Sequence, residues 1–560
     1  MDSAQDHNQQ PPPSLAIRDI MSRLGVLFRA ERRVLGLIFS YALAIGLFSL
    51  IVPLTVQELV NTFAFAIQPI TIVTLSIIIL ASLLFVGAFK AFQVYAEEVL
   101  QRRLFARVAL GMTHHFPDVR IAGFRPRYAN YFTEAVFMQR ALSGLLIDFI
   151  DVVIGGIVGM TLLLFYHPYF LGFNIVLFGG GALVFVLLSQ GGLKATLEVS
   201  HWKYSTMHWL QEIAYNLLHF KATTSKPYLL RRTDELVDRY MEARRTRFAV
   251  LMRQYLGSVV WQALGHGGII ATAGWLLSIG QLTLGQLVAA QVIVGRLLFS
   301  FESLVKKMGH VFYFFTALTE LDFVFSLPKD EHRAVMSVPL PDPTIHGIRL
   351  TCRDVGLGEP EHGAALFEHF ELEITPGEKV GILTMSNQAK TTLARVLAGL
   401  EHPASGVVRY NGVDLRHLDM DSINTYRGLV LDSRLTLFEG TVEDNISLGR
   451  PSIAYSDLRW ALRFTDLEEE IDALPQGIKT HVRAEGAVFS PARIQKMLVA
   501  RAIVTRPHIL IFDGLLHNMH PIQRETLLRR LCAKEEPWSV VFISNDPILT
   551  PYIDRRIEIG

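Results

Sequence analysis

Residues 380–393 read VGILTMSNQAKTTL, an apolar strand followed by a short turn and then by a helix that opens with Lys390, Thr391 and Thr392. This order is typical of a loop that binds the phosphates of a nucleotide. At this distance from the strand, Lys390 offers a positive charge to a phosphate, and Thr391 offers a hydroxyl to Mg²⁺. The stretch therefore predicts a strand, a loop and a helix that could hold the phosphates of a nucleotide and Mg²⁺.

The turn of this loop lacks the glycines that such loops use. Glycine lets the backbone approach the phosphates closely, in conformations that a Cβ atom would strain. Thr384, Asn387 and Ala389 stand at those positions. We therefore expect weak binding of ATP and Mg²⁺, or none.

The composition places part of the chain in lipid. Of its 560 residues, 50% are hydrophobic and only 19% are charged, which is too apolar for a soluble protein. The 53 basic and 52 acidic residues nearly cancel, so the charge gives no reason to expect a nucleic acid partner. Cys352 and Cys532 form neither a zinc motif nor a disulfide framework, which fits a reducing cytosolic location for the C-terminal part.

The segments around the loop extend the pattern. ELEITPGEK lies upstream at 371–379, and LAGL at 397–400 and YNGVD at 410–414 lie downstream. The passage from Ile348 to the C-terminus resembles the nucleotide-binding domain of an ABC transporter. The resemblance implies an α/β P-loop domain over 348–560, and the alternation of short β-type runs with helical ones favours a largely parallel sheet.

The N-terminal part contains apolar segments long enough to cross a hydrocarbon core of about 30 Å. Residues 1–16 are polar and proline-rich and predict a disordered tail, and 17–327 predict an all-α membrane domain that opens with a basic amphipathic helix. The proline-rich segment 328–347 is interpreted as a linker. We predict six spans, in three hairpins, at about 34–57, 70–92, 145–166, 169–189, 256–279 and 282–301.

Charge orients these spans. The long segments between the hairpins, 93–144 and 190–255, are rich in Arg and Lys, so the positive-inside rule places them in the cytoplasm. The N-terminus and the C-terminal domain then also lie on the cytoplasmic side of the inner membrane. This layout, with the segment GLFSLIVPLTVQELVN at 46–61, resembles the ABC exporter family. The resemblance implies a half-transporter that forms a homodimer, or a heterodimer with another ABC half-transporter.

Few polar residues interrupt the spans. Ionisable groups at membrane depth usually face a bundle interior or a watery cavity. Arg296, about fourteen residues in from the outer loop, is the main candidate for a substrate pathway, together with Gln291 and His266. His266 stands among glycines, a pattern that more often indicates close helix packing. The apolar spans favour an amphipathic or lipidic substrate.

Within the ABC resemblance, the residues expected to bind and hydrolyse ATP are largely replaced. Glu359 stands where the family has an aromatic residue that stacks on adenine, and Ser433 where it has a glutamine that approaches the metal and the attacking water. Asp513 ends a strand, as required for holding Mg²⁺, but it is followed by Gly514 instead of the glutamate that acts on the water. Gly514 has no side chain to serve as a base.

The signature and switch motifs also differ from the family pattern. FSPAR at 489–493, with Ser490 as its signature-like residue, replaces the segment that offers N–H groups to the γ-phosphate held by the opposing subunit. Pro491 removes one of those donors. The switch histidine is Asn545, and the usual Asp of the preceding loop is His520.

These losses favour a dimeric ABC exporter-like membrane protein whose C-terminal domain is a pseudo-ATPase, acting as a transport subunit or a regulator. Removing a base or a phosphate-stabilising donor typically costs about 10²- to 10⁴-fold in rate, so their joint absence leaves hydrolysis near background. The alternative is an active exporter or flippase of an amphipathic or lipidic substrate that works with a competent partner chain. A receptor or channel-like protein without a transport cycle is a third reading.

Overall fold

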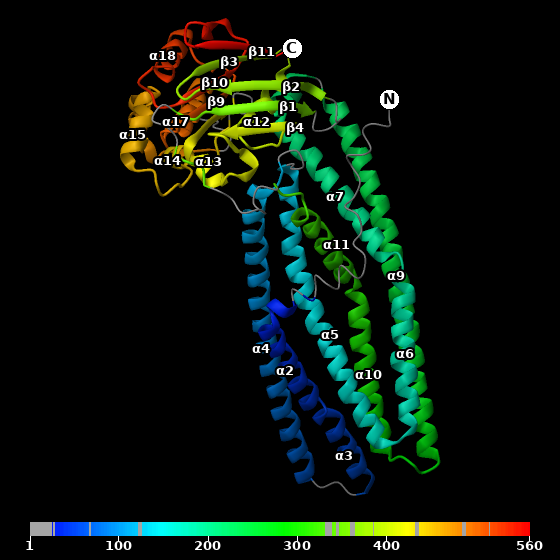
Figure 1. Ribbon diagram of the computed structural model, residues 1–560. Coiled ribbons are helices and arrows are strands. Elements are labelled where there is room, and N and C mark those ends of the chain that lie inside the picture. Colours follow the sequence, from blue (N-terminus) through cyan, green and yellow to red (C-terminus); the bar gives the residue numbers. More distant parts are fainter. Residues whose placement is uncertain are drawn as a thin grey trace. The chain divides into compact units, whose positions relative to one another are not determined.

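The computed structural model divides into two compact units (Figure 1). A helical unit comprises Met1–Pro117 with Arg125–Leu327, and an α/β unit comprises Asp118–Phe124 with Pro328–Gly560. The structure describes residues 25, 28–65, 69–120, 126–223, 225–330, 339–342, 347–358, 365–384, 386–431, 436–483, 489–514 and 516–559. The predicted tail at 1–16 lies outside these ranges, as do most of the predicted amphipathic helix and most of the predicted linker.

The helical unit is built from long helices that pack along one another, as α2 does along α4 (Figure 1). Its described helices are α2 (Arg32–Ser49), α3 (Ile51–Phe65), α4 (Pro69–His115), α5 (Phe132–Tyr166), α6 (Tyr169–Leu188), α7 (Gly192–Tyr215), α8 (Leu217–Ala222), α9 (Lys226–Ser278), α10 (Leu284–Lys306) and α11 (Met308–Phe325). At 1.5 Å per residue, α4 and α9 are longer than a membrane crossing requires.

Five helical segments in the described residues are long and apolar enough to cross a membrane: Arg32–Thr62, Pro69–Asp118, Pro126–Tyr166, Tyr169–Tyr215 and Leu284–Lys306. The predicted span at 256–279 is helical within α9 but is not among them. Gln262, His266 and five glycines lower the hydropathy of that stretch. The predicted first span is divided at Leu50 into α2 and α3, and Pro53 lies in the first turn of α3, where proline is tolerated.

Two further polar residues of the predicted spans have local structural partners. Gln286 completes a capping box with Thr283 at the start of α10, where the Gln286 N–H donates to Thr283 Oγ1 at 3.1 Å. The Gln262 side chain donates to Glu302 Oε2 at 2.6 Å. Gly280, in the turn before α10, has a φ of +74°, a conformation that favours glycine.

The α/β unit contains a parallel sheet and an antiparallel sheet. The parallel sheet has the order β11-β3-β10-β9-β6, and the antiparallel sheet has the order β2-β1-β4-β5. The strands are β1 (Leu350–Gly358), β2 (Ala365–Ile374), β3 (Lys379–Thr384), β4 (Ser405–Tyr410), β5 (Val413–Asp414), β6 (Arg427–Leu431), β7 (Gly440–Thr441), β8 (His481–Val482), β9 (Ile509–Asp513), β10 (Ser539–Ile543) and β11 (Arg555–Ile559). The helices are α12 (Asn387–Leu397), α13 (Met420–Tyr426), α14 (Val442–Ser447), α15 (Tyr455–Phe464), α16 (Glu468–Asp472), α17 (Pro491–Ile503) and α18 (Pro521–Leu531).

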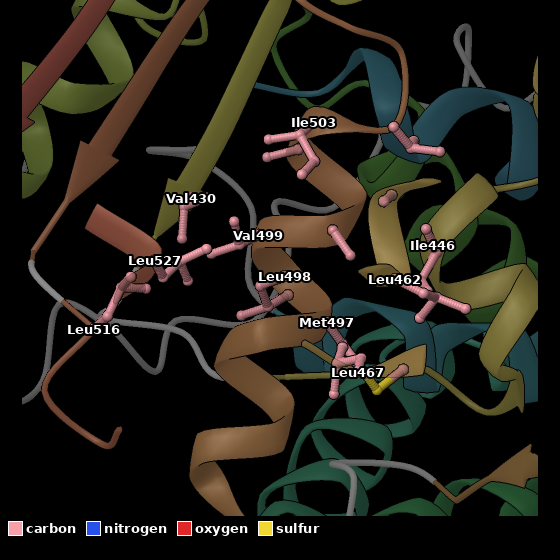
Figure 2. Packing of buried hydrophobic residues seen from close by; sticks show 14 of the residues in the cluster. Val430, Ile446, Leu462, Leu467, Met497, Leu498, Val499, Ile503, Leu516 and Leu527 are labelled. Atoms are coloured by element: carbon pink, nitrogen blue, oxygen red, sulfur yellow. The ribbon is translucent and has the colours of Figure 1, made fainter. Parts of the chain in front are cut away.

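Apolar side chains cover both faces of the parallel sheet, because successive residues of a strand point to opposite faces. In β9, Leu510 and Phe512 join a core with α17 and α18, whereas Ile509 and Ile511 join a core with α12 and the antiparallel sheet. Figure 2 shows the first of these cores, in which side chains of α17 meet residues from β6, α14, α15 and α18. The predicted fold class, an all-α membrane domain followed by an α/β domain, is confirmed.

Candidate nucleotide site

The phosphate-loop stretch forms the predicted strand and helix. β3 ends at Thr384, and α12 begins at Asn387 with Ser386 as its N-cap. The Ala389 N–H donates to Ser386 Oγ at 3.2 Å. A helix N-terminus binds anions through such N–H groups, so in this structure one of the donors that would face a phosphate is already occupied by a side chain of the loop itself.

Lys390, Thr391 and Asp513 come together at the carboxyl edge of the parallel sheet. β3 and β9 both pair with β10, so the helix that follows β3 starts beside the end of β9. Lys390 Nζ lies 3.5 Å from Asp513 Oδ1, and Thr391 Oγ1 donates to Asp513 Oδ2 at 2.9 Å. Asp513 is fully buried and Lys390 mostly so. The charge offered to a phosphate is thus balanced by the carboxylate offered to the metal.

Thr392, the third residue of this motif, is buried and follows Thr391 into α12. Glu359 and Ser433, at the predicted adenine and glutamine positions, lie outside the described residues.

Gly514, at the position of the catalytic base, has a backbone conformation that disfavours any other residue. Its φ is +111°, a region that residues with a Cβ atom rarely adopt, and its N–H donates to Ile543 O at 3.2 Å. This backbone conformation disfavours a glutamate at position 514.

The signature-like segment begins α17. Ser490 is its N-cap and accepts from the Arg493 N–H at 3.3 Å, and Pro491 is the first helical residue. Arg493 Nε lies 2.8 Å from Glu470 Oε2, and Lys496 Nζ lies 3.1 Å from Glu470 Oε1. Burial raises the pKa of Glu470, but the bonds from these two cations outweigh it and hold the pKa below its ordinary value.

The positions of the switch loop contain no histidine base. Asn545 is exposed just after β10, and His520 is the N-cap residue of α18 but makes no capping hydrogen bond with its side chain. Asp546, which follows Asn545, forms an ion pair with Arg524 at 3.2 Å. This local ion pair fixes the loop after β10 through groups that the sequence analysis did not single out.

The predicted substrate residues lie in the helical unit. Gln291 Nε2 on α10 lies 2.9 Å from His266 Nδ1 on α9, so these two residues are direct partners. Arg296 lies further along α10 and lines a cavity that also contains Lys90 and Asp151. The sequence analysis missed Asp151, although a carboxylate inside an apolar segment is a signal that could have found it.

Comparison with known proteins places these observations in a family. Residues 367–516 match the ABC transporter family. The C-terminal part of the chain therefore contains an ABC transporter domain. The chain is 25% identical, over 55% of its length and 52% of the relative, to the mycobactin import ATP-binding/permease protein IrtB of Mycolicibacterium thermoresistibile. It is 27% identical, over 43% of its length and 35% of the relative, to the alpha-hemolysin translocation ATP-binding protein HlyB of Escherichia coli.

The fold agrees with that of an exporter. A solved structure of a bacterial Atm1-family ABC exporter with ATP bound superposes with a TM-score of 0.81, at 17% identity, over 92% of each chain. The chain spans about half or less of the length of the curated relatives named above. It therefore has the fold of an exporter-type half-transporter, a helical membrane domain followed by an ABC nucleotide-binding domain.

The described residues fit MgATP in part. Lys390 suits a phosphate, and Thr391 and Asp513 suit Mg²⁺, which such domains bind together with ATP. The occupied Ala389 N–H and the positive φ of Gly514 do not suit phosphate enclosure and hydrolysis.

Proposed function

We propose that this chain is a subunit of a dimeric ABC membrane transporter whose nucleotide-binding domain keeps its fold but does not turn over ATP, so that it serves as a transport subunit or as a regulator. One observation carries the proposal: Gly514 stands at the position of the base with a φ of +111°. Glycine has no side chain that could act as a base, and a glutamate at this position would strain the backbone.

The contacts of Lys390 support the same proposal. Its ammonium faces Asp513 at 3.5 Å, while Thr391 donates to the other carboxylate oxygen. In this arrangement a phosphate would compete with Asp513 for the Lys390 ammonium and with Ser386 for the Ala389 N–H. We infer that Lys390, Thr391, Thr392 and Asp513, with Ser433, form a residual site in which ATP and Mg²⁺ bind weakly.

A competent partner chain is the second candidate. Each ATP site in the family combines one chain's phosphate loop with the other chain's signature, so a heterodimer can keep one working site. The observation that favours it is Ser490, which is exposed at the N-terminus of α17 and retains a hydroxyl and a helix N-terminus. Two features weigh against this candidate. Pro491 removes a backbone N–H donor. Arg493 forms an ion pair with Glu470 of the same chain, so its side chain is not directed to a nucleotide held by the partner.

The proposed topology follows from charge. The basic segments 93–144 and 190–255, the N-terminus and the α/β domain lie in the cytoplasm, and the spans cross the inner membrane. Arg296, Gln291 and His266 belong to the substrate pathway, and the substrate is amphipathic or lipidic. We propose a homodimer, or a heterodimer with another ABC half-transporter.

The test is the ATPase activity of the purified full-length chain in lipid nanodiscs, alone and with a co-expressed half-transporter. We expect no phosphate release above that of the Lys390→Ala variant when the chain is alone. Release at ordinary exporter rates, abolished by Lys390→Ala, would refute the pseudo-ATPase. Release that appears only with the partner and is lost in Ser490→Ala would instead support the second candidate.

A further inference from the structure

A cavity of about 330 Å³ lies among α2, α4, α5 and α10 in the helical unit. Most of its wall is apolar and comes from residues such as Ile45, Val158 and Ile293. Lys90 of α4 and Arg296 of α10 also line this cavity, so it holds two cationic side chains within the predicted membrane-spanning region.

Both cations interact with the Asp151 carboxylate through the cavity but form no direct ion pair with it. Among the described residues, neither Lys90 nor Arg296 has a hydrogen bond or an ion pair within 4.0 Å, whereas the nearby Lys306 lies 2.6 Å from Glu302. The carboxylate of the cavity, Asp151, accepts a hydrogen bond from Gln93 at 3.2 Å. Two cations against one carboxylate leave the cavity with a net positive charge.

Uncompensated charge is costly at membrane depth, so it usually marks a binding site or a pathway. Snorkelling to the membrane surface would explain Lys90 alone. It does not explain Arg296, which is predicted to lie further from the surface and whose guanidinium lines the same cavity. An anionic group placed between them would supply the missing charge, and a guanidinium binds carboxylates and phosphates in a bidentate manner.

A second cavity, of about 680 Å³, adjoins the first. Val152 and Leu297 line both cavities, so the two share a wall. The second cavity is bounded almost entirely by apolar side chains of α5, α6, α9, α10 and α11, with Trp261 and Phe301 among them. A charged cavity next to an apolar one matches a molecule with an anionic head and a hydrocarbon chain.

We infer that the helical unit binds an anionic amphiphile, with its carboxylate or phosphate between Lys90 and Arg296 and its chain in the apolar cavity. The inference names the substrate class of the proposed transporter. The role of the amphiphile as transported substrate rests on that proposed function. Membrane phospholipids and free fatty acids share this chemistry, and the test separates the two sources.

The test measures binding to the full-length chain in phosphatidylcholine nanodiscs without nucleotide. One arm uses dansyl-undecanoic acid, a free acid, with its methyl ester as the neutral control. The other arm uses a fluorescent phosphatidic acid incorporated into the nanodisc, with the matching phosphatidylcholine as control. We expect at least one acidic probe to bind, with affinity about tenfold above its control, because a charge-assisted contact is at stake. The arm that binds identifies the source.

Variants of the cavity supply the decisive comparison. Arg296→Met and Lys90→Met should each weaken binding of the acidic probe about tenfold, and Arg296→Lys should restore most of it. Lys306→Met removes a cation of α10 that is paired with Glu302 outside this cavity, so it should leave binding unchanged. Asp151→Asn should tighten binding, because it removes the carboxylate and keeps an acceptor for Gln93.

Asp151→Asn also keeps the test valid if Arg296→Met fails to fold. Equal binding of the acid and its neutral control, unchanged binding in a folded Arg296→Met, or weaker binding in Asp151→Asn would overturn the inference. Since the assay contains no nucleotide, its failure is distinct from a failure of the pseudo-ATPase proposal.

Discussion

The two units of this chain differ in whether the cationic side chains at their candidate anion sites form ion pairs with carboxylates. In the α/β unit, where the family binds a polyanion, Lys390 faces Asp513 at 3.5 Å and Arg493 faces Glu470 at 2.8 Å. In the helical unit, where charge is more costly, Lys90 and Arg296 line a cavity without an ion pair among the described residues. Under the proposals above, the membrane domain is better suited to bind an anion than the phosphate loop is, because the cations of its cavity have no direct ion pair among the described residues.

Under the proposed function, the contacts of Asp513 would preserve the fold of a domain that does not hydrolyse ATP. The contacts of Asp513 with Lys390 and Thr391 hold the start of α12 against the end of β9. A carboxylate retained only for Mg²⁺ would leave structure unchanged when removed, whereas one that neutralises a neighbouring lysine would not.

Replacing Asp513 tests this contrast with the largest expected effect. Asp513→Ala leaves the Lys390 ammonium without its partner, and we expect it to destabilise the α/β unit by about 3 kcal/mol. Hydrogen exchange of the amides in α12 and β9 measures this locally in the full-length protein. Lys390→Met combined with Asp513→Ala should recover part of the loss. A single variant with unchanged exchange would show that the pair has no structural role.

The helical unit also contains a buried acidic cluster, which extends the comparison from cations to carboxylates. Glu134 and Glu320 are both buried, and Glu134 accepts from Lys203 and, at 2.7 Å, from the Tyr204 hydroxyl. Glu320 lies on α11, beyond the last candidate span. Burial, aided by the Glu134 carboxylate, raises the pKa of Glu320 to about 8 from an ordinary 4.5.

This raised pKa predicts that stability falls as the pH rises. Between pH 4.5 and about 8, the folded protein holds a proton on Glu320 that the unfolded chain has released, so the free energy of unfolding declines across that window. Glu320→Gln mimics the protonated form and should remove about 2 kcal/mol of this decline. Thermal unfolding of both proteins in nanodiscs at pH 6 and pH 8.5 measures it, and parallel pH profiles would contradict the assignment.

Restoring the missing base should fail. Gly514→Glu places a side chain at a φ of +111°, and we expect a loss of about 1 kcal/mol with no gain in ATP hydrolysis. Gly514→Ala is the matched control, because it brings the same strain without a carboxylate. Hydrogen exchange reports the strain, and phosphate release reports the chemistry. A Gly514→Glu variant that hydrolyses ATP would show that the rest of the site had remained competent.

The smallest effect is expected at α17. Glu470→Gln weakens the contacts to Arg493 and to the buried Lys496. Because the Glu470 carboxylate is itself 36% exposed and the amide keeps an acceptor oxygen, the change should cost about 0.5 kcal/mol. The lowered pKa of Glu470 gives the sign: its contribution is present above the ordinary carboxyl pKa and is lost as the pH falls through the lowered one. Chemical unfolding at pH 7 and pH 3 measures both, and an equal difference at the two pH values would contradict it.

Local sequence patterns predicted the fold and part of the site. The strand and helix around residues 380–393 are set by an apolar run and a polar helix start, so Lys390 and Thr391 could be placed before the structure was known. Asp513 was placed in the same way, by its position at the end of a strand.

The remaining features depend on contacts between distant segments. The cavity of Lys90, Asp151 and Arg296 joins three helices, and no spacing in the sequence brings those residues together. The φ of Gly514 is likewise a property of the folded loop, because glycine adopts negative and positive φ about equally well. Gln286 is a related case, because only the fold shows that this polar residue serves a helix cap.

The most direct test of the account is a single-turnover experiment on the full-length chain in nanodiscs. The protein, in excess over radiolabelled ATP and with Mg²⁺, is incubated without a partner chain, and the ADP formed is separated and counted. The account predicts that the ATP is recovered intact, as with Lys390→Ala. ADP formed in proportion to the protein, and absent with Lys390→Ala, would contradict it.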